Sequence, residues 1–165
     1  MEQGQRQRRT LFIDFDGVLH SQELGFDFWD LHGPIVELRA AGLFEHTNLL
    51  HEALKPFDSM MRIDIRVHSS WRKTHPDDSL RRLLGDLAPR FTGATHRGLE
   101  REDSIRDFVR SKGLAEGSYR ALDDQPELMP MLVAAGLVIA CDPVLGISEP
   151  RVIAEIVEWL RGPGA

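Results

Sequence analysis

Residues 11–19 read LFIDFDGVL, an apolar run that ends in two acids and a glycine. The apolar residues before Asp14 predict a strand that is buried on both faces. Side chains alternate along an extended chain, so Asp14 and Asp16 point to the same side, and Gly17 then allows a sharp turn. A buried acid is costly unless it is paired or binds a metal, so the two carboxylates indicate a hard-oxygen site suited to Mg2+. The alternative is a strand that ends in a plain Asp-Gly turn.

The composition is that of a soluble globular protein of one domain, with 165 residues of which 42% are hydrophobic and 28% charged. The net charge of −6 argues against a protein held to nucleic acid by bulk charge, but it is compatible with a local basic groove. The single Cys141 excludes an internal disulfide framework and fits a reducing, cytoplasmic location. No apolar run is long enough to span a bilayer, so we expect no membrane partner. We expect a disordered or frayed tail at residues 1–9 and a single domain at residues 10–161.

Strand-like and helix-like patterns alternate along the chain. Strands are expected at residues 10–15, 62–68, 90–95, 118–122 and 137–141. Helices are expected at residues 36–54 with a break near Gly42, and at residues 76–87, 102–112, 127–135 and 149–160. This alternation predicts an α/β fold of three layers, a central and mostly parallel sheet flanked by helices. In such sheets the ligand lies outside the carboxyl ends of the strands, so the residues that end each strand carry the functional information.

Polar residues follow two further strands at their carboxyl ends. Ser69 and Ser70 come after the second strand, where a hydroxyl and free backbone N–H groups can hold an anionic oxygen, unless the serine only caps a helix. Asp123 and Asp124 come after the fourth strand and would complete an oxygen cage with the first acids, unless they form an Asx turn. Arg101 lies at the start of the helix predicted at residues 102–112, directly before Glu102, where a cation opposes the macrodipole, so it is available to neutralise a bound anion.

In their order along the chain, these motifs resemble those of the haloacid dehalogenase (HAD) superfamily over residues 11–147. Residues 14–18 look like its first motif, Ser69 like its second, and residues 123–124 like its fourth. Arg101 looks like the basic residue of the third motif, a position for which Arg97 and Lys112 compete. Two segments, residues 69–72 and 142–146, look most like small bacterial HAD-like proteins related to nucleic-acid-repair phosphatase domains.

The resemblance implies a Rossmann-like HAD fold and a Mg2+-dependent phosphomonoester hydrolase. Asp14 would attack the phosphoryl group and form an aspartyl-phosphate, while Asp16 would protonate the leaving oxygen and later activate water. Ser69, Ser70 and Arg101 would bind the phosphoryl oxygens. The metal would be held by four acids, of which Asp16 contributes its backbone carbonyl and Asp124 either binds directly or orients its neighbours: Asp14, Asp16, Asp123 and Asp124.

Little or no cap domain is expected, because the segment at residues 25–61 between the first two motifs is short. The site would then be open and would admit an extended substrate. Phe26, Phe28 and Trp29 lie in this segment and either pack the loop onto the core or stack on a base or sugar. His20 follows the first motif and His68 lies beside the second, and each is interpreted as a core histidine or as a substrate contact.

The sequence is compatible with several functions. The phosphorylated substrate is either a small molecule or a nucleic-acid end, which includes a polynucleotide 3′-phosphatase activity; the acidic pI argues against the latter and the missing cap favours it. A non-catalytic binding or regulatory module would not need two acidic strand ends. Transfer of the phosphoryl group to an acceptor other than water shares the first half-reaction. No obligate protein partner is inferred.

Overall fold

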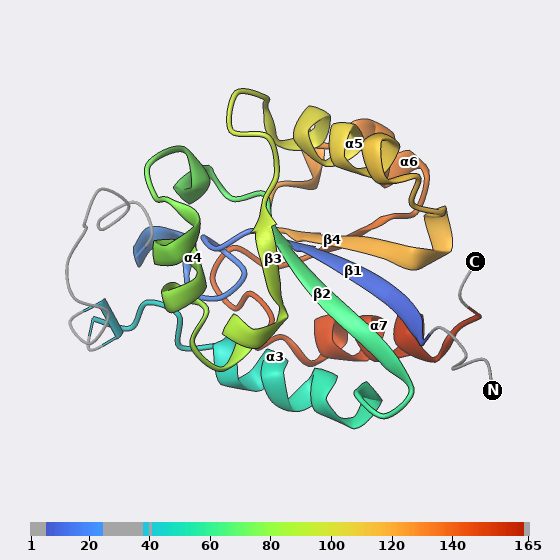
Figure 1. Cartoon of the computed structure of the whole chain (residues 1–165). Helices are drawn as coiled ribbons and strands as arrows, with labels where there is room; N and C mark the ends of the chain where they lie inside the picture. The colour runs from blue at the N-terminus through green and yellow to red at the C-terminus, as the bar shows by residue number, and fades with distance from the viewer. Residues whose placement is uncertain (1–5, 25–37, 40, 164–165) are drawn as a thin grey trace.

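A computed structural model describes residues 6–24, 38–39 and 41–163, and its centre is a parallel sheet (Figure 1). The sheet order is β3-β2-β1-β4-β5, with every neighbouring pair parallel. The strands are β1 (Gln7–Ile13), β2 (Met61–Val67), β3 (Phe91–Ala94), β4 (Tyr119–Asp123) and β5 (Val138–Ala140). The α/β fold with a parallel central sheet is therefore confirmed.

Helices cover both faces of this sheet. The α-helices are α3 (Thr47–Leu54), α4 (Asp77–Leu83), α5 (Arg101–Lys112), α6 (Pro130–Ala134) and α7 (Pro150–Arg161). Short 3-10 helices form η1 (Lys55–Phe57), η2 (Ser70–Lys73), η3 (Gly85–Arg90), η4 (Glu116–Ser118) and η5 (Pro126–Leu128). Helices α5 and α6 lie on one face and α3 and α7 on the other, which gives the three layers of a Rossmann-like fold (Figure 1). Within the described residues, no helix combines the length and apolarity needed to span a bilayer.

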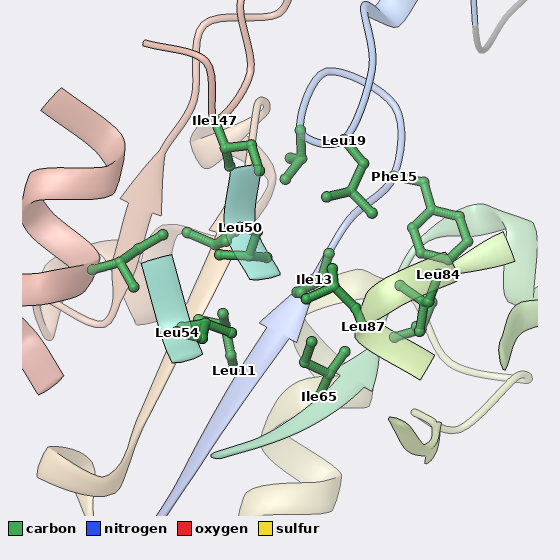
Figure 2. Close-up of a cluster of buried hydrophobic side chains, with 14 of the residues drawn as sticks. Leu11, Ile13, Phe15, Leu19, Leu50, Leu54, Ile65, Leu84, Leu87 and Ile147 are labelled. Atoms are coloured by element: carbon green, nitrogen blue, oxygen red, sulfur yellow. The ribbon is translucent and has the colours of Figure 1, made fainter. Parts of the chain in front are cut away.

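The two faces of β1 are buried in separate apolar clusters. Leu11 and Ile13 point toward Leu50 and Leu54 of α3 (Figure 2). Phe12 points to the other face, into the cluster beneath α5 and α6. Full burial of such a side chain contributes roughly 1.5–3 kcal/mol. This double burial is the physical reason for the uninterrupted apolar run before Asp14.

The first strand begins earlier than the sequence indicated. Gln7 pairs with Met61 of β2, so residues 7–9 belong to β1 and are not a frayed tail. Arg9 explains the difference, because its side chain is buried and donates to the carbonyls of Gly117 and Gly162. Arg9, which the sequence placed in a solvent-exposed tail, instead links β1 to the segments before β4 and after α7.

Helix boundaries differ most where glycine or proline intervenes. The helix expected at residues 76–87 ends at Leu83 and continues as η3, which contains Pro89 and starts at Gly85 with a φ of 55°. The helix expected at residues 127–135 is divided into η5 and α6 ahead of Pro130, whose ring cannot continue a helix from the preceding turn. Phe26, Phe28 and Trp29 lie outside the described residues, so the expectations about them stay predictions.

Candidate active site

The predicted site residues meet at the carboxyl edge of the sheet. β1 lies between β2 and β4, so the residues that follow these three strands are neighbours (Figure 1). The backbone N–H of Asp14 donates to the carbonyl of Leu122 at 3.1 Å, and that of His68 donates to the carbonyl of Ile13 at 3.1 Å. The sheet hydrogen bonding therefore continues past the strand ends and fixes the loops relative to one another.

Three carboxylates form a buried cluster at this edge. Oxygens of Asp14, Asp123 and Asp124 all lie within 4.8 Å of one another, an arrangement that could hold a metal ion. The Oδ2 atom of Asp124 is buried and has no hydrogen-bond partner. Buried polar atoms are rarely left unpartnered, so this oxygen is a ready ligand for a cation.

Arg101 is the cation that the structure places against these acids. Its Nη1 atom lies 3.1 Å from Oδ2 of Asp14 and 2.6 Å from Oδ1 of Asp123. The two ion pairs offset the unfavourable position of a cation at the first residue of α5. The competing candidates lie elsewhere: Arg97 binds Asp77 and two backbone carbonyls, and Lys112 is exposed at the far end of α5.

The three acids differ in how their charge is stabilised. Burial, and then the charge of Asp123, raise the pKa of Asp14 to about 8, although Arg101 opposes this. Burial would also raise the pKa of Asp123, but a hydrogen bond from His68 and the charge of Arg101 outweigh it and lower that pKa. Burial and Asp123 raise the pKa of Asp124 to about 6. The cluster thus holds more negative charge than Arg101 alone neutralises.

Asp16 lies outside this cluster and has its own partners. Its Oδ1 atom accepts from Nε2 of His20 at 2.7 Å and from Nε1 of Trp71 at 3.0 Å. His20 can act as the donor because its other ring nitrogen, Nδ1, accepts the backbone N–H of Phe44 at 3.2 Å. The second oxygen, Oδ2, has no hydrogen bond to any residue that the structure describes. Nothing in the sequence spacing singles out Trp71 or Phe44 for these contacts.

The two serines after β2 have different surroundings. Ser69 is fully buried, and its Oγ accepts the backbone N–H of Trp71 at 3.3 Å as the cap of η2. That contact leaves the hydroxyl hydrogen of Ser69 to donate. Ser70 is exposed at the start of η2. Arg72 fixes this loop from within, since its buried guanidinium donates to the carbonyls of His68, Ser69 and Leu99.

A model of the family described as the HAD domain in Swiss Army Knife RNA repair proteins matches residues 10–152. The chain belongs to this family. The HAD resemblance drawn from the motifs is therefore confirmed, and all four motif positions lie inside the matched region. No curated protein and no solved structure matches the chain.

Two residues of this HAD domain support the acids without having been predicted to do so. His68 is fully buried and lies with Nε2 at 2.8 Å from Oδ2 of Asp123, so it is a core histidine, as one of the two interpretations has it, and its partner is a carboxylate of the site. Gly17 has a φ of 74°, and a Cβ atom there would lie 2.3 Å from Cγ of Asp124. Only glycine lets the first-motif loop approach Asp124 so closely.

Proposed function

We propose that this HAD domain is a Mg2+-dependent phosphomonoester hydrolase that works through an aspartyl-phosphate on Asp14. The observation that carries the proposal is the meeting of Asp14, Asp123, Asp124 and Arg101 at the carboxyl edge of the sheet, with Asp16 two residues from Asp14. Members of the HAD family are generally hydrolases, and many are phosphatases.

The residues present fit a magnesium ion. Mg2+ prefers oxygen ligands, and Asp14, Asp123 and Asp124 would supply carboxylate oxygens, among them the unpartnered Oδ2 of Asp124. The side chain of Asp16 accepts from His20 and Trp71 through Oδ1, so we assign its backbone carbonyl to the metal and its Oδ2 to proton transfer. A bound Mg2+ would offset the repulsion between an anionic nucleophile and an anionic substrate.

The first half-reaction forms a covalent intermediate. A carboxylate oxygen of Asp14 attacks phosphorus, and the ester P–O bond to the leaving group breaks. The leaving oxygen takes a proton from Asp16. Because Oδ1 of Asp16 is occupied by two donors, Oδ2 is the oxygen that carries this proton.

The second half-reaction restores the enzyme. The carboxylate of Asp16 removes a proton from water, whose oxygen attacks phosphorus while the bond to Asp14 breaks. Inorganic phosphate leaves, and Asp14 is again a carboxylate. Arg101 and the hydroxyl of Ser69 stabilise the charge on the phosphoryl oxygens during both transfers.

The proposal is tested by assaying p-nitrophenyl phosphate with and without Mg2+. We expect Mg2+-dependent release of p-nitrophenol by the natural chain and none by Asp14→Asn. The matched control is Asp107→Asn on α5, an acid far from the site whose side chain is 43% exposed and forms an ion pair with Arg110 at 4.0 Å. Full activity of Asp14→Asn, or the same loss in Asp107→Asn, would contradict the role of Asp14.

The family description favours a second, more specific substrate, a phosphorylated RNA end. On this alternative the enzyme would release phosphate from a 3′-phosphorylated oligonucleotide faster than from a nucleoside monophosphate at equal concentration. A 5′-phosphorylated strand of the same sequence is the control. Adding an alcohol acceptor and analysing the products separates hydrolysis from phosphoryl transfer.

A further inference from the structure

A cavity lined mostly by charged residues lies at the opposite edge of the sheet from the acidic cluster. Its volume is about 1010 Å3, and it borders the amino ends of β1 and β2 (Figure 1). β3 pairs with β2 only from Ile65 onward, so the first residues of β2 have no strand on that side. The lining includes four arginines and three aspartates: Arg6, Arg8, Arg62, Arg90, Asp58, Asp64 and Asp86.

Two of these arginines are held side by side. Arg8 and Arg62 are register partners across the parallel pair β1–β2, a position where like charges repel. The carboxylate of Asp64, which is only 3% exposed, binds both: Nε of Arg8 donates to Oδ2, and Nε of Arg62 donates to Oδ1 at 2.8 Å. One buried acid thus fixes the orientation of two guanidinium groups.

This pairing leaves donors and charge unused. Both arginines bind Asp64 through Nε, and neither has another hydrogen-bond partner among the residues that the structure describes. Their side chains remain 60% and 63% exposed. Arg90 is neutralised by a two-pronged ion pair with Asp58, at 2.7 and 2.9 Å. Two arginines on one carboxylate therefore leave one positive charge and four free Nη groups.

A further polar atom of the same cavity has no partner. Nδ1 of His51, on α3, is buried and makes no hydrogen bond. The cavity thus combines oriented guanidinium groups, surplus positive charge and an unpartnered imidazole nitrogen. None of these groups takes part in the chemistry at the other edge.

We propose that Arg8 and Arg62 form a binding site for a phosphate-bearing anion, separate from the catalytic edge. The planar fork of a guanidinium matches two phosphate oxygens at once. The phosphate belongs either to a free small anion or to the backbone of a nucleic acid, which presents the same oxygens. The inference does not depend on the proposed hydrolase activity, because it concerns residues at the opposite edge of the sheet.

The test is an NMR titration of the full chain without Mg2+, which reads the amides of residues 7–8 and 61–64 separately from those of residues 14–17. One arm uses inorganic phosphate, and the other uses a single-stranded oligoribonucleotide without terminal phosphates. We expect saturable shifts at the amino-edge amides. A response to phosphate in the millimolar range identifies a free anion, and a response to the oligonucleotide alone identifies the backbone.

Arg62→Gln removes the surplus charge while Asp64 keeps Arg8 as its partner, so the fold is not left with an unpaired buried acid. We expect this variant to bind at least about 10-fold more weakly, with p-nitrophenyl phosphate turnover unchanged. Arg8→Gln, which leaves Arg62 on Asp64, should behave alike. Arg110→Gln makes the same charge change on an 81% exposed side chain and should bind normally. The absence of shifts at the amino edge, or equal binding by Arg62→Gln and Arg110→Gln, would overturn the proposal.

Discussion

At the scale of single residues, the protonation of Asp14 couples the candidate site to stability. Its pKa is raised to about 8, mainly by burial, whereas an unfolded aspartate titrates near 3.9. Between these values the folded protein binds the extra proton, so raising the pH without metal destabilises it, by up to about 1.4 kcal/mol per pH unit. Asp123 has a lowered pKa and stays ionised through this range.

We therefore expect the Tm in EDTA to fall by several degrees between pH 6 and pH 8. Mg2+ should flatten this decline because it stabilises the ionised carboxylates. Asp14→Asn should flatten it without metal, since the titrating group is gone. Thermal unfolding followed by circular dichroism at several pH values tests this. A decline that is as steep in Asp14→Asn as in the natural chain would show that another group causes it.

The hydrogen bonds that Asp16 accepts should matter most for substrates whose leaving group needs a proton. Trp71→Phe removes the Nε1–H donor from Oδ1 of Asp16 but keeps an aromatic ring in the core. We expect kcat to fall about 10-fold for β-glycerophosphate, whose alkoxide needs a proton, as part of the 10²–10⁴-fold that general acid catalysis supplies. Turnover of p-nitrophenyl phosphate should change much less, because its leaving group is stable without a proton.

Trp159→Phe is the matched control for this experiment. Trp159 is also buried and also donates through Nε1, but to the carbonyl of Gly117, near the opposite edge of the sheet. It should lower stability without changing the ratio of the two rates. Equal losses on both substrates in Trp71→Phe would mean that Trp71 supports the fold and does not orient Asp16.

At the scale of elements, the loop after β1 depends on Gly17. In Gly17→Ala, the new Cβ would lie 2.3 Å from Cγ of Asp124, at a φ of 74° that alanine disfavours by about 1–2 kcal/mol. Gly113, at the end of α5, has a φ of 63°, but a methyl group added there would meet nothing within 4 Å. Both variants should lose stability, and only Gly17→Ala should also bind Mg2+ at least about 10-fold more weakly, as calorimetric titration would measure. Equal Mg2+ affinity in the two variants would contradict the role of this close approach.

The same elements show what the sequence could predict. The acids lie at one edge as predicted, because parallel strands share their carboxyl ends and an apolar run with a terminal acid marks such an end. The partners of Asp16 could not be predicted, since His20 and Trp71 reach it through the conformations of the loop after β1 and of η2, which leave no periodic pattern. The predicted start of β1 is wrong because Arg9 resembles a solvent-exposed charge, whereas its partners are carbonyls about a hundred or more residues away.

At the scale of the whole molecule, Arg9 joins segments from both ends of the domain. It donates to the carbonyl of Gly162 beyond α7 at 2.7 Å and to that of Gly117 in η4, and its guanidinium lies 5.6 Å from the ring of Trp159. The carbonyl of Gly117 also accepts Nε1 of Trp159 at 3.0 Å. The central strand is thereby tied to the last helix and to the segment before β4.

This arrangement predicts where the chain can be shortened. A chain that starts at Thr10 loses the pairing of residues 7–9 with β2 and the contacts of Arg9, whereas a chain that starts at Arg6 keeps both. With net contributions of about 1 kcal/mol for each hydrogen bond, we expect the free energy of unfolding to differ by roughly 2–4 kcal/mol. Urea unfolding of the two chains measures this difference. Equal urea midpoints would mean that residues 10–13 are sufficient for β1. The acids at the carboxyl end of β1 would then be held in place without the contacts of Arg9 at its amino end.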